Sequence, residues 1–179
     1  MVAISYPFVI GIIIPSLLTV RVMIWLRAKR IDFSREIRLL PAAICILVIA
    51  RFTFFPFSKV DGMVQPLLFD PQNWFVFRIN LIPFVHLFDY PEKQDALLNL
   101  LGNTLMFLPV GIVWPAVFPQ LRTGRKALAA GVGFSFAIEI LQLPFFDRVS
   151  DIDDLILNSL GFILGFGIWF FCQRHQKKT

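Results

Sequence analysis

The sequence has little of what builds a disulfide framework, a zinc centre or a hydrolase triad. It contains two cysteines and two histidines in 179 residues. Cys45 and Cys172 do not form a CxxC pair, so we expect neither a disulfide framework nor a zinc site of that kind, only two small apolar packing residues. A Ser-His-Asp arrangement, a glycine-rich phosphate loop and a His-rich zinc spacing are also absent from the sequence.

Charged residues are scarce as well. They make up 16% of the chain against 57% hydrophobic residues, and the mean hydropathy is +0.72. This composition is too apolar for a soluble domain of this size, and the alternation of a membrane β-barrel is missing. Because a helix satisfies its own backbone in lipid, we predict an all-α, polytopic integral membrane helical bundle. About five transmembrane helices are expected, at residues 3–26, 39–57, 96–118, 127–143 and 155–171.

Basic residues mark alternate connections between these spans. Clusters of Lys and Arg follow the first, third and fifth spans, whereas the other two connections hold nine carboxylates. The positive-inside rule therefore predicts an outside N-terminus and a cytoplasmic C-terminus. These clusters explain the sequence pI of about 9.6, so no nucleic-acid partner is expected. The first stretch lacks a basic segment before it and a cleavage site, and we expect it to be retained.

Polar residues inside the apolar stretches gather near their outer ends. Arg51 lies about 9 Å below the outer end of its span and Glu139 about 6 Å below its own. Because a lone charge at this depth costs about 2.5–3.5 kcal/mol, we expect these two residues to pair. Arg21, near an inner end, is expected to reach the headgroups without a functional role. The predicted outward-opening polar pocket comprises Arg51, Asn99, Asn103, Glu139, Gln142, Arg148, Asp151, Asp154 and Asn158.

Structural roles compete with a binding role for several of these residues. Ser150 with Asp153 fits an N-capping box, so part of the acidic run could simply begin the last helix. The asparagines could be hydrogen-bonding glue between helices. Gly161 and Gly165 have the spacing that lets helices approach closely. Pro109 is expected to break or kink the third span, as is Pro115, and Gly111 to loosen it.

Four motifs in order carry a resemblance to a known family. They are Asn80-Leu-Ile-Pro83-Phe84, the run from Asn99 to Gly111, Glu139-Ile-Leu-Gln142, and Arg148-Val-Ser-Asp151-Ile-Asp153-Asp154 followed by Asn158 and Gly161. Over residues 39–171 the chain resembles the VanZ-like family. We take Asn80 and Pro83 of the first motif as structural.

The resemblance implies a small multi-pass helical protein of the bacterial cytoplasmic membrane. Some relatives are linked to reduced susceptibility to teicoplanin-type glycopeptide antibiotics, but no catalytic assignment comes with the family. We expect a single membrane domain over residues 1–179. Its parts are a first helix with a basic loop (1–38), the VanZ-like core (39–171) and a basic cytoplasmic tail (172–179).

Three functions remain open, and binding is the one we expect. In that reading the pocket holds the headgroup of a membrane lipid or a lipid-linked envelope precursor, Arg51 pairs with an anionic group, and no cofactor is needed. In an enzyme reading, Glu139, Asp151, Asp153 and Asp154 would hold a divalent cation such as Mg²⁺ for chemistry on a phospholipid or lipid-linked precursor. Small-solute transport is the third, because kinked helices and buried charges are typical of transporters.

Overall fold

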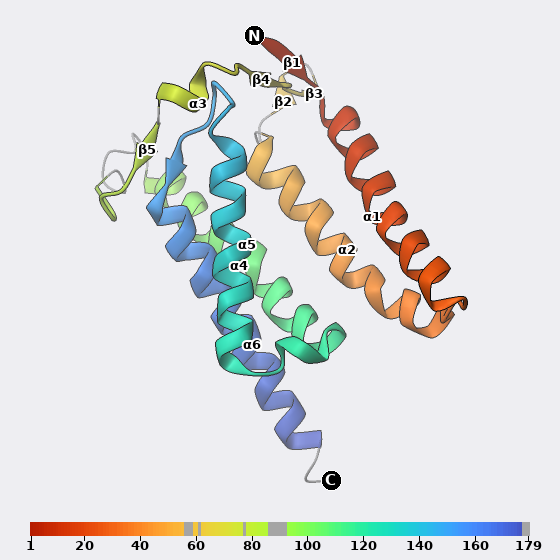
Figure 1. Ribbon diagram of the computed structural model, residues 1–179. Helices are drawn as coiled ribbons and strands as arrows, with labels where there is room; N and C mark the ends of the chain where they lie inside the picture. The colour runs from red at the N-terminus through yellow and green to blue at the C-terminus, as the bar shows by residue number, and fades with distance from the viewer. Residues whose placement is uncertain (56–58, 61, 77, 86–92, 177–179) are drawn as a thin grey trace.

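The protein is built from five long helices, which confirms the helical class. The computed structural model describes residues 1–55, 59–60, 62–76, 78–85 and 93–176 (Figure 1). A four-residue helix, α3 (Asn73–Val76), and a 3-10 turn, η1 (Pro119–Leu121), lie in the connections. The long helices are α1 (Tyr6–Ala28), α2 (Phe33–Phe54), α4 (Lys93–Val117), α5 (Gly124–Gln142) and α6 (Ile152–Gln176).

Four of these helices, rather than five, are long and apolar enough to cross a membrane among the described residues. They are α1, α2, residues 96–117 of α4, and α6. The remaining helix, α5, covers residues 127–142 of the predicted span 127–143 but carries Arg125, Lys126 and Glu139 in 19 residues. Helix α5 is therefore shorter than the other four, and its charged residues keep it from being as apolar as they are.

Short strands, which the all-α expectation did not include, join the loops at one end of the bundle. Strand β1 (Val2–Ile4) pairs antiparallel with β4 (Leu67–Phe69), and β2 (Lys59–Val60) pairs with β3 (Met63–Val64). Strand β5 (Ile79–Asn80) runs parallel to β6 (Ser150–Asp151). Ala3 and Ile4, assigned to the first span, thus precede its helix, because β4 supplies a partner for their backbone, and Ser5 caps the start of α1.

Helices α4 and α6 form the tightest contact of the fold. A Cβ atom built on Gly161 would lie 2.0 Å from the Thr104 carbonyl oxygen, and one on Gly165 would lie 2.1 Å from that of Leu108. Gly111 meets the α6 backbone at Phe162 in the same way, at 2.1 Å. Only a hydrogen fits at these positions, so the two backbones touch. Helix α4 runs unbroken through Pro109 and Pro115.

The core lies where α2 and α5 pack around this pair. Its buried side chains are Ile49, Phe107, Val110, Ala127, Ile138 and Phe162. Helix α1 lies outside the core and has no buried residue, although it packs against α2 to form a hairpin (Figure 1).

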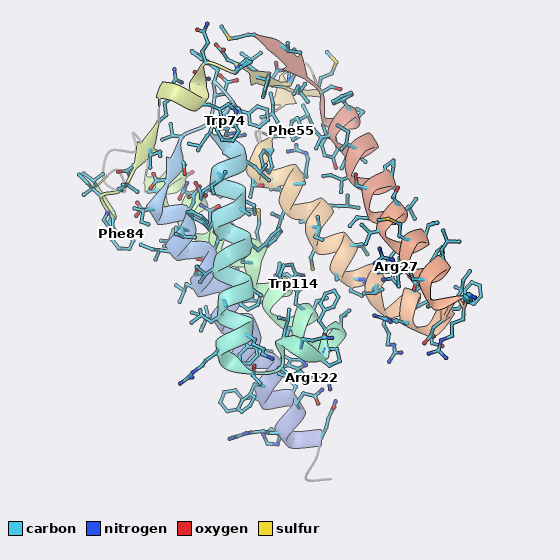
Figure 2. All side chains as sticks on the ribbon, in the orientation of Figure 1. Arg27, Phe55, Trp74, Phe84, Trp114 and Arg122 are labelled. Carbon is cyan, nitrogen blue, oxygen red and sulfur yellow. The ribbon has the colours of Figure 1, made fainter. Side chains whose placement is uncertain are left out.

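The two ends of the bundle differ in chemistry. The α1–α2 turn, η1 and the C-terminus lie toward one end, and the N-terminus with β1 lies at the other (Figure 1). Figure 2 shows Arg27 and Arg122 toward the first end and Trp74 toward the second. The described residues of the three basic clusters therefore belong to one end, which we call the basic end. The opposite end, where the strands lie, holds the polar residues described next.

Candidate functional site

Three predicted pocket residues cap the C-terminal end of α2. The last carbonyl groups of a helix have no partner within it and need outside donors. Gln142 Nε2 donates to the Thr53 oxygen at 2.8 Å. Arg148 donates to the Phe54 oxygen from Nε at 3.2 Å and from a terminal nitrogen at 2.8 Å. Arg51 donates to the Phe55 oxygen at 3.2 Å. We call Arg51, Gln142 and Arg148 the α2 cap cluster.

The predicted ion pair between Arg51 and Glu139 is wrong. In the described part of the chain, the ion pair is Arg21 with Glu36. The Arg51 guanidinium lies over the rings of Tyr6, at 5.6 Å, and Phe52, at 5.2 Å. Arg51 and Glu139 instead bind backbone groups at helix ends, and Arg51 also lies over aromatic rings. These partners are close by and do not require an opposite charge.

The segment Ser150–Asp154 is the hub of a second group of polar residues. Glu139 Oε2 accepts a hydrogen bond from the Asp151 backbone nitrogen at 2.9 Å. Asp151 Oδ1 in turn accepts from the Asp153 nitrogen at 2.9 Å and so caps α6, a role that the capping-box pattern gave to Ser150. Asp154 accepts from the Asn103 side chain on α4. We call Asn80, Asn103, Glu139, Asp151, Asp153 and Asp154 the acidic cluster.

The loop that carries the first sequence motif closes over this cluster. Asn80 Nδ2 donates to Asp151 Oδ1 at 3.1 Å, and the Phe84 nitrogen donates to Asp153 Oδ1 at 2.8 Å. Phe84 has a φ of 59°, a left-handed conformation that is uncommon for a bulky residue. The bond to Asp153 accompanies this conformation, so Asp151 and Asp153 together hold the loop against the start of α6. Pro83, between Asn80 and Phe84 in the sequence, is exposed.

A buried amide lies one helical turn below the cluster. Asn158 Nδ2 donates to Ser135 Oγ on α5 at 3.0 Å, and both side chains are buried. The Asn158 Oδ1 has no hydrogen-bond partner in the described part of the chain, and neither has Gln142 Oε1. Ser135 is four residues before Glu139, and Asn158 four after Asp154, which places both on the cluster side of their helices.

The acidic cluster is rich in hydrogen-bond acceptors. Only one oxygen each of Asp151, Asp153 and Asp154 accepts a hydrogen bond from the residues that the structure describes. The Arg148 guanidinium interacts electrostatically with Asp154 of the cluster, and burial lowers the pKa of Arg148, while Asp147 and Asp154 oppose that shift. Among the described residues, no three His, Cys, Asp or Glu side chains are grouped as a metal ion would require.

The residues of the predicted pocket therefore form two neighbouring groups with different structural roles. Arg51, Gln142 and Arg148 cap α2, and Asn103, Glu139, Asp151 and Asp154 join in the acidic cluster. Asn99 is half-buried on α4 one turn from Asn103, and no hydrogen bond links it to either group in the described residues. The sequence reasoning missed Ser135 because a serine in an apolar span carries no signal of its own.

Arg21 also has a partner that the sequence reasoning missed. It binds Glu36 on α2 through two nitrogens, and the Trp25 indole donates to the same carboxylate at 3.0 Å. The hairpin of α1 and α2 brings these residues together across the turn, so Arg21 does not simply reach toward the headgroups.

Comparisons with known proteins agree with the four motifs. The family model VanZ/LLP1 matches residues 42–173. Protein VanZ from Enterococcus faecium is 29% identical over 108 residues, 59% of this chain, and the chain spans 62% of that relative's length. No solved structure matches the chain. Because the matched region covers well over half of the sequence and contains both polar groups, the chain belongs to the VanZ/LLP1 family.

Proposed function

We propose that the acidic cluster binds the headgroup of an envelope lipid or a lipid-linked cell-wall precursor. The observation that carries this proposal is the surplus of acceptor oxygens on Asp151, Asp153 and Asp154. Acceptor-rich carboxylates complement hydroxyl and ammonium donors, which headgroups and precursor sugars and peptides supply. Glu139 and Asp153 are buried, and a buried ionisable residue of a membrane protein is a candidate functional residue.

The division of the site changes how such a ligand would be held. Arg51 and Arg148 already donate to the end of α2, so these two side chains are not assigned to a ligand phosphate. Asn103 and Asp154 lie on different helices, α4 and α6, and are only partly buried. A ligand donor can reach Asp154 there without breaking the backbone caps.

The location and the physiological role are part of the same proposal. With the basic end in the cytoplasm, the acidic cluster faces outward from a bacterial cytoplasmic membrane. A bound cell-wall precursor there would alter susceptibility to teicoplanin-type glycopeptides, as the family resemblance implies for some relatives.

Native mass spectrometry of the purified protein tests the proposal. The probes are phosphatidylethanolamine, which has an ammonium headgroup, and a lipid-linked cell-wall precursor. Asp154→Asn and Asn103→Leu should reduce retention of at least one probe by roughly tenfold, since a hydrogen bond to a charged group contributes about 1.5–3 kcal/mol. Asp70→Asn is the matched control, because Asp70 caps Gln72 at the same end and lies outside the cluster.

Two outcomes would reject the proposal. One is wild-type retention of both probes by folded Asp154→Asn and Asn103→Leu proteins. The other is an equal loss in Asp70→Asn, which would show that retention depends on the charge of this end in general. Either result would leave the cluster as a structural clamp for the loop at residues 79–84.

A further inference from the structure

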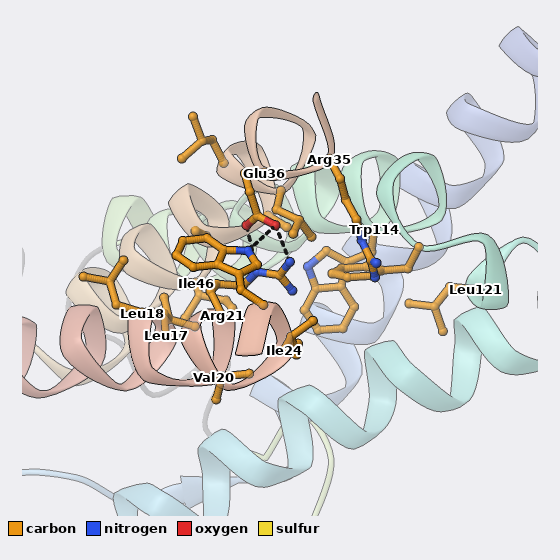
Figure 3. A pocket seen from close by; sticks show the side chains of 16 residues that line it. Leu17, Leu18, Val20, Arg21, Ile24, Arg35, Glu36, Ile46, Trp114 and Leu121 are labelled. Atoms are coloured by element: carbon orange, nitrogen blue, oxygen red, sulfur yellow. Dashed lines mark hydrogen bonds and ion pairs between the residues drawn. The ribbon is translucent and has the colours of Figure 1, made fainter. Parts of the chain in front are cut away.

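A second feature lies at the basic end, on the other side of the molecule from the acidic cluster. A groove of about 700 Å³ separates the α1–α2 hairpin from the end of α4 and η1. This volume is within the roughly 300–1,000 Å³ typical of pockets that enclose a ligand. Its lining is apolar except for Arg21, Trp25, Arg35 and Glu36. Figure 3 shows the Glu36 carboxylate facing Arg21, and the Arg35 side chain reaching toward Trp114.

The charged residues that line the groove carry a net positive charge. Glu36 is already occupied by Arg21 and by the Trp25 indole, as the dashed lines in Figure 3 show. Arg35 also lines the groove, and no carboxylate of the described residues lies within ion-pair distance of it. Between Arg21 and Arg38 the sequence holds six cations and two carboxylates. The groove therefore offers a guanidinium to an anionic ligand.

The wall of the groove also contains a donor without an acceptor. The Trp114 indole lines the groove, and its Nε1 has no hydrogen-bond partner in the part of the chain that is described. Trp114 is on the last turn of α4, toward the same end as Arg35 in the first turn of α2. A ligand with an anion at the helix ends and an acceptor slightly deeper would satisfy both groups.

From these observations we infer that the groove binds an anionic phospholipid. One acyl chain lies along the apolar walls, the phosphate pairs with Arg35, and an ester carbonyl accepts from Trp114. Helices α1 and α2 are both apolar enough to cross a membrane, so the space between them and α4 opens to hydrocarbon. The leaflet around the basic end is the one that would supply this lipid, independently of any headgroup at the acidic cluster.

Fluorescence quenching in reconstituted vesicles tests the inference. Trp74→Phe and Trp169→Phe leave the two tryptophans that line the groove. Phosphatidylglycerol with brominated acyl chains should quench their fluorescence with an apparent affinity about fivefold higher than that of brominated phosphatidylcholine. This is the preference expected for one cation at a membrane surface. Arg35→Gln should abolish the preference, and Arg35→Lys should restore most of it.

Two matched controls locate the lipid. Arg38→Gln removes a neighbouring cation that bonds to the Ser34 carbonyl and does not line the groove, so it should keep the preference. Ala43→Phe fills the groove and should reduce quenching by phosphatidylglycerol, whereas Ala129→Phe on the exposed face of α5 should not. Equal quenching by both lipids, or no effect of Ala43→Phe, would overturn the inference.

Discussion

At the scale of single residues, backbone groups decide what the polar side chains do. Gln142 and Arg148 are far from α2 in sequence, yet both donate to its final carbonyl groups. Glu139 accepts from the backbone at the start of α6. The reason is that unpaired backbone groups at helix ends are costly to bury, and side chains from neighbouring helices are the available partners.

Arg148 donates two hydrogen bonds to one carbonyl group of α2 and gives the first prediction. Arg148→Gln should lower the free energy of unfolding by about 1.5–3 kcal/mol, because hydrogen bonds to a charged group contribute this much. Denaturant or thermal unfolding in detergent measures the loss. Arg78→Gln is the comparison, since Arg78 donates to the exposed Phe146 carbonyl at the same end. A smaller loss for Arg148→Gln than for Arg78→Gln would contradict the capping role.

The buried Ser135–Asn158 bond gives the second prediction. Ser135→Ala leaves the Asn158 amide without its acceptor and should cost about 1–3 kcal/mol of unfolding free energy. Once Asn158→Leu is present, the same serine change should cost much less, and a double-mutant cycle measures the difference. Strictly additive losses would show that the two side chains act independently.

At the scale of elements, the contact of α4 with α6 organises the molecule. Gly161 and Gly165 place the α6 backbone against the carbonyl groups of Thr104 and Leu108. This approach fixes the start of α6 beside α4, and it therefore brings Asp154 to Asn103. The acidic cluster depends on a seam of small residues that lies deeper in the membrane-spanning part.

The third prediction tests this seam. Gly161→Ala or Gly165→Ala should destabilise the protein by about 1–3 kcal/mol, because the added methyl group would overlap a backbone carbonyl. Gly102→Ala and Gly133→Ala are the controls, since nothing lies within 4 Å of a Cβ at either site. Alanine is the better helix former, so the controls should be neutral or stabilising. Thermal stability in detergent separates the two pairs.

At the scale of the whole molecule, charge separates the two ends. The described residues of the basic clusters lie toward the end with the α1–α2 turn and η1, and the acidic cluster lies toward the end with the strands (Figure 1). This separation matches the distribution expected when the basic end faces the cytoplasm.

The fourth prediction concerns that orientation. In a background with Cys45→Ala and Cys172→Ser, a membrane-impermeant maleimide should label Ser5→Cys and Met63→Cys in intact cells. Thr123→Cys and Gln176→Cys should be labelled only after the membrane is opened, because they follow the third and fifth predicted spans. The reverse pattern would place the acidic cluster in the cytoplasm and remove the basis for an outward-facing site.

The sequence by itself determined the helical membrane class, the family, and the bounds of the long helices to within six residues. These follow from long apolar runs, clustered basic residues and ordered motifs, all of which are local along the chain. The same local reading counted α5 as a fifth span, although its charges set it apart from the four most apolar helices.

Only the tertiary structure decided which partner each polar residue takes. The sequence predicts that Arg51 and Glu139 lie at a similar depth in the membrane. Depth along two separate helices does not determine which faces of those helices are in contact. Packing through Gly161 and Gly165 sets the rotation of α6 against α4, and the ends of α2 and α6 present backbone groups that need partners. These long-range constraints turn one predicted pocket into an α2 cap cluster and an acidic cluster, because a buried backbone group takes the nearest donor or acceptor.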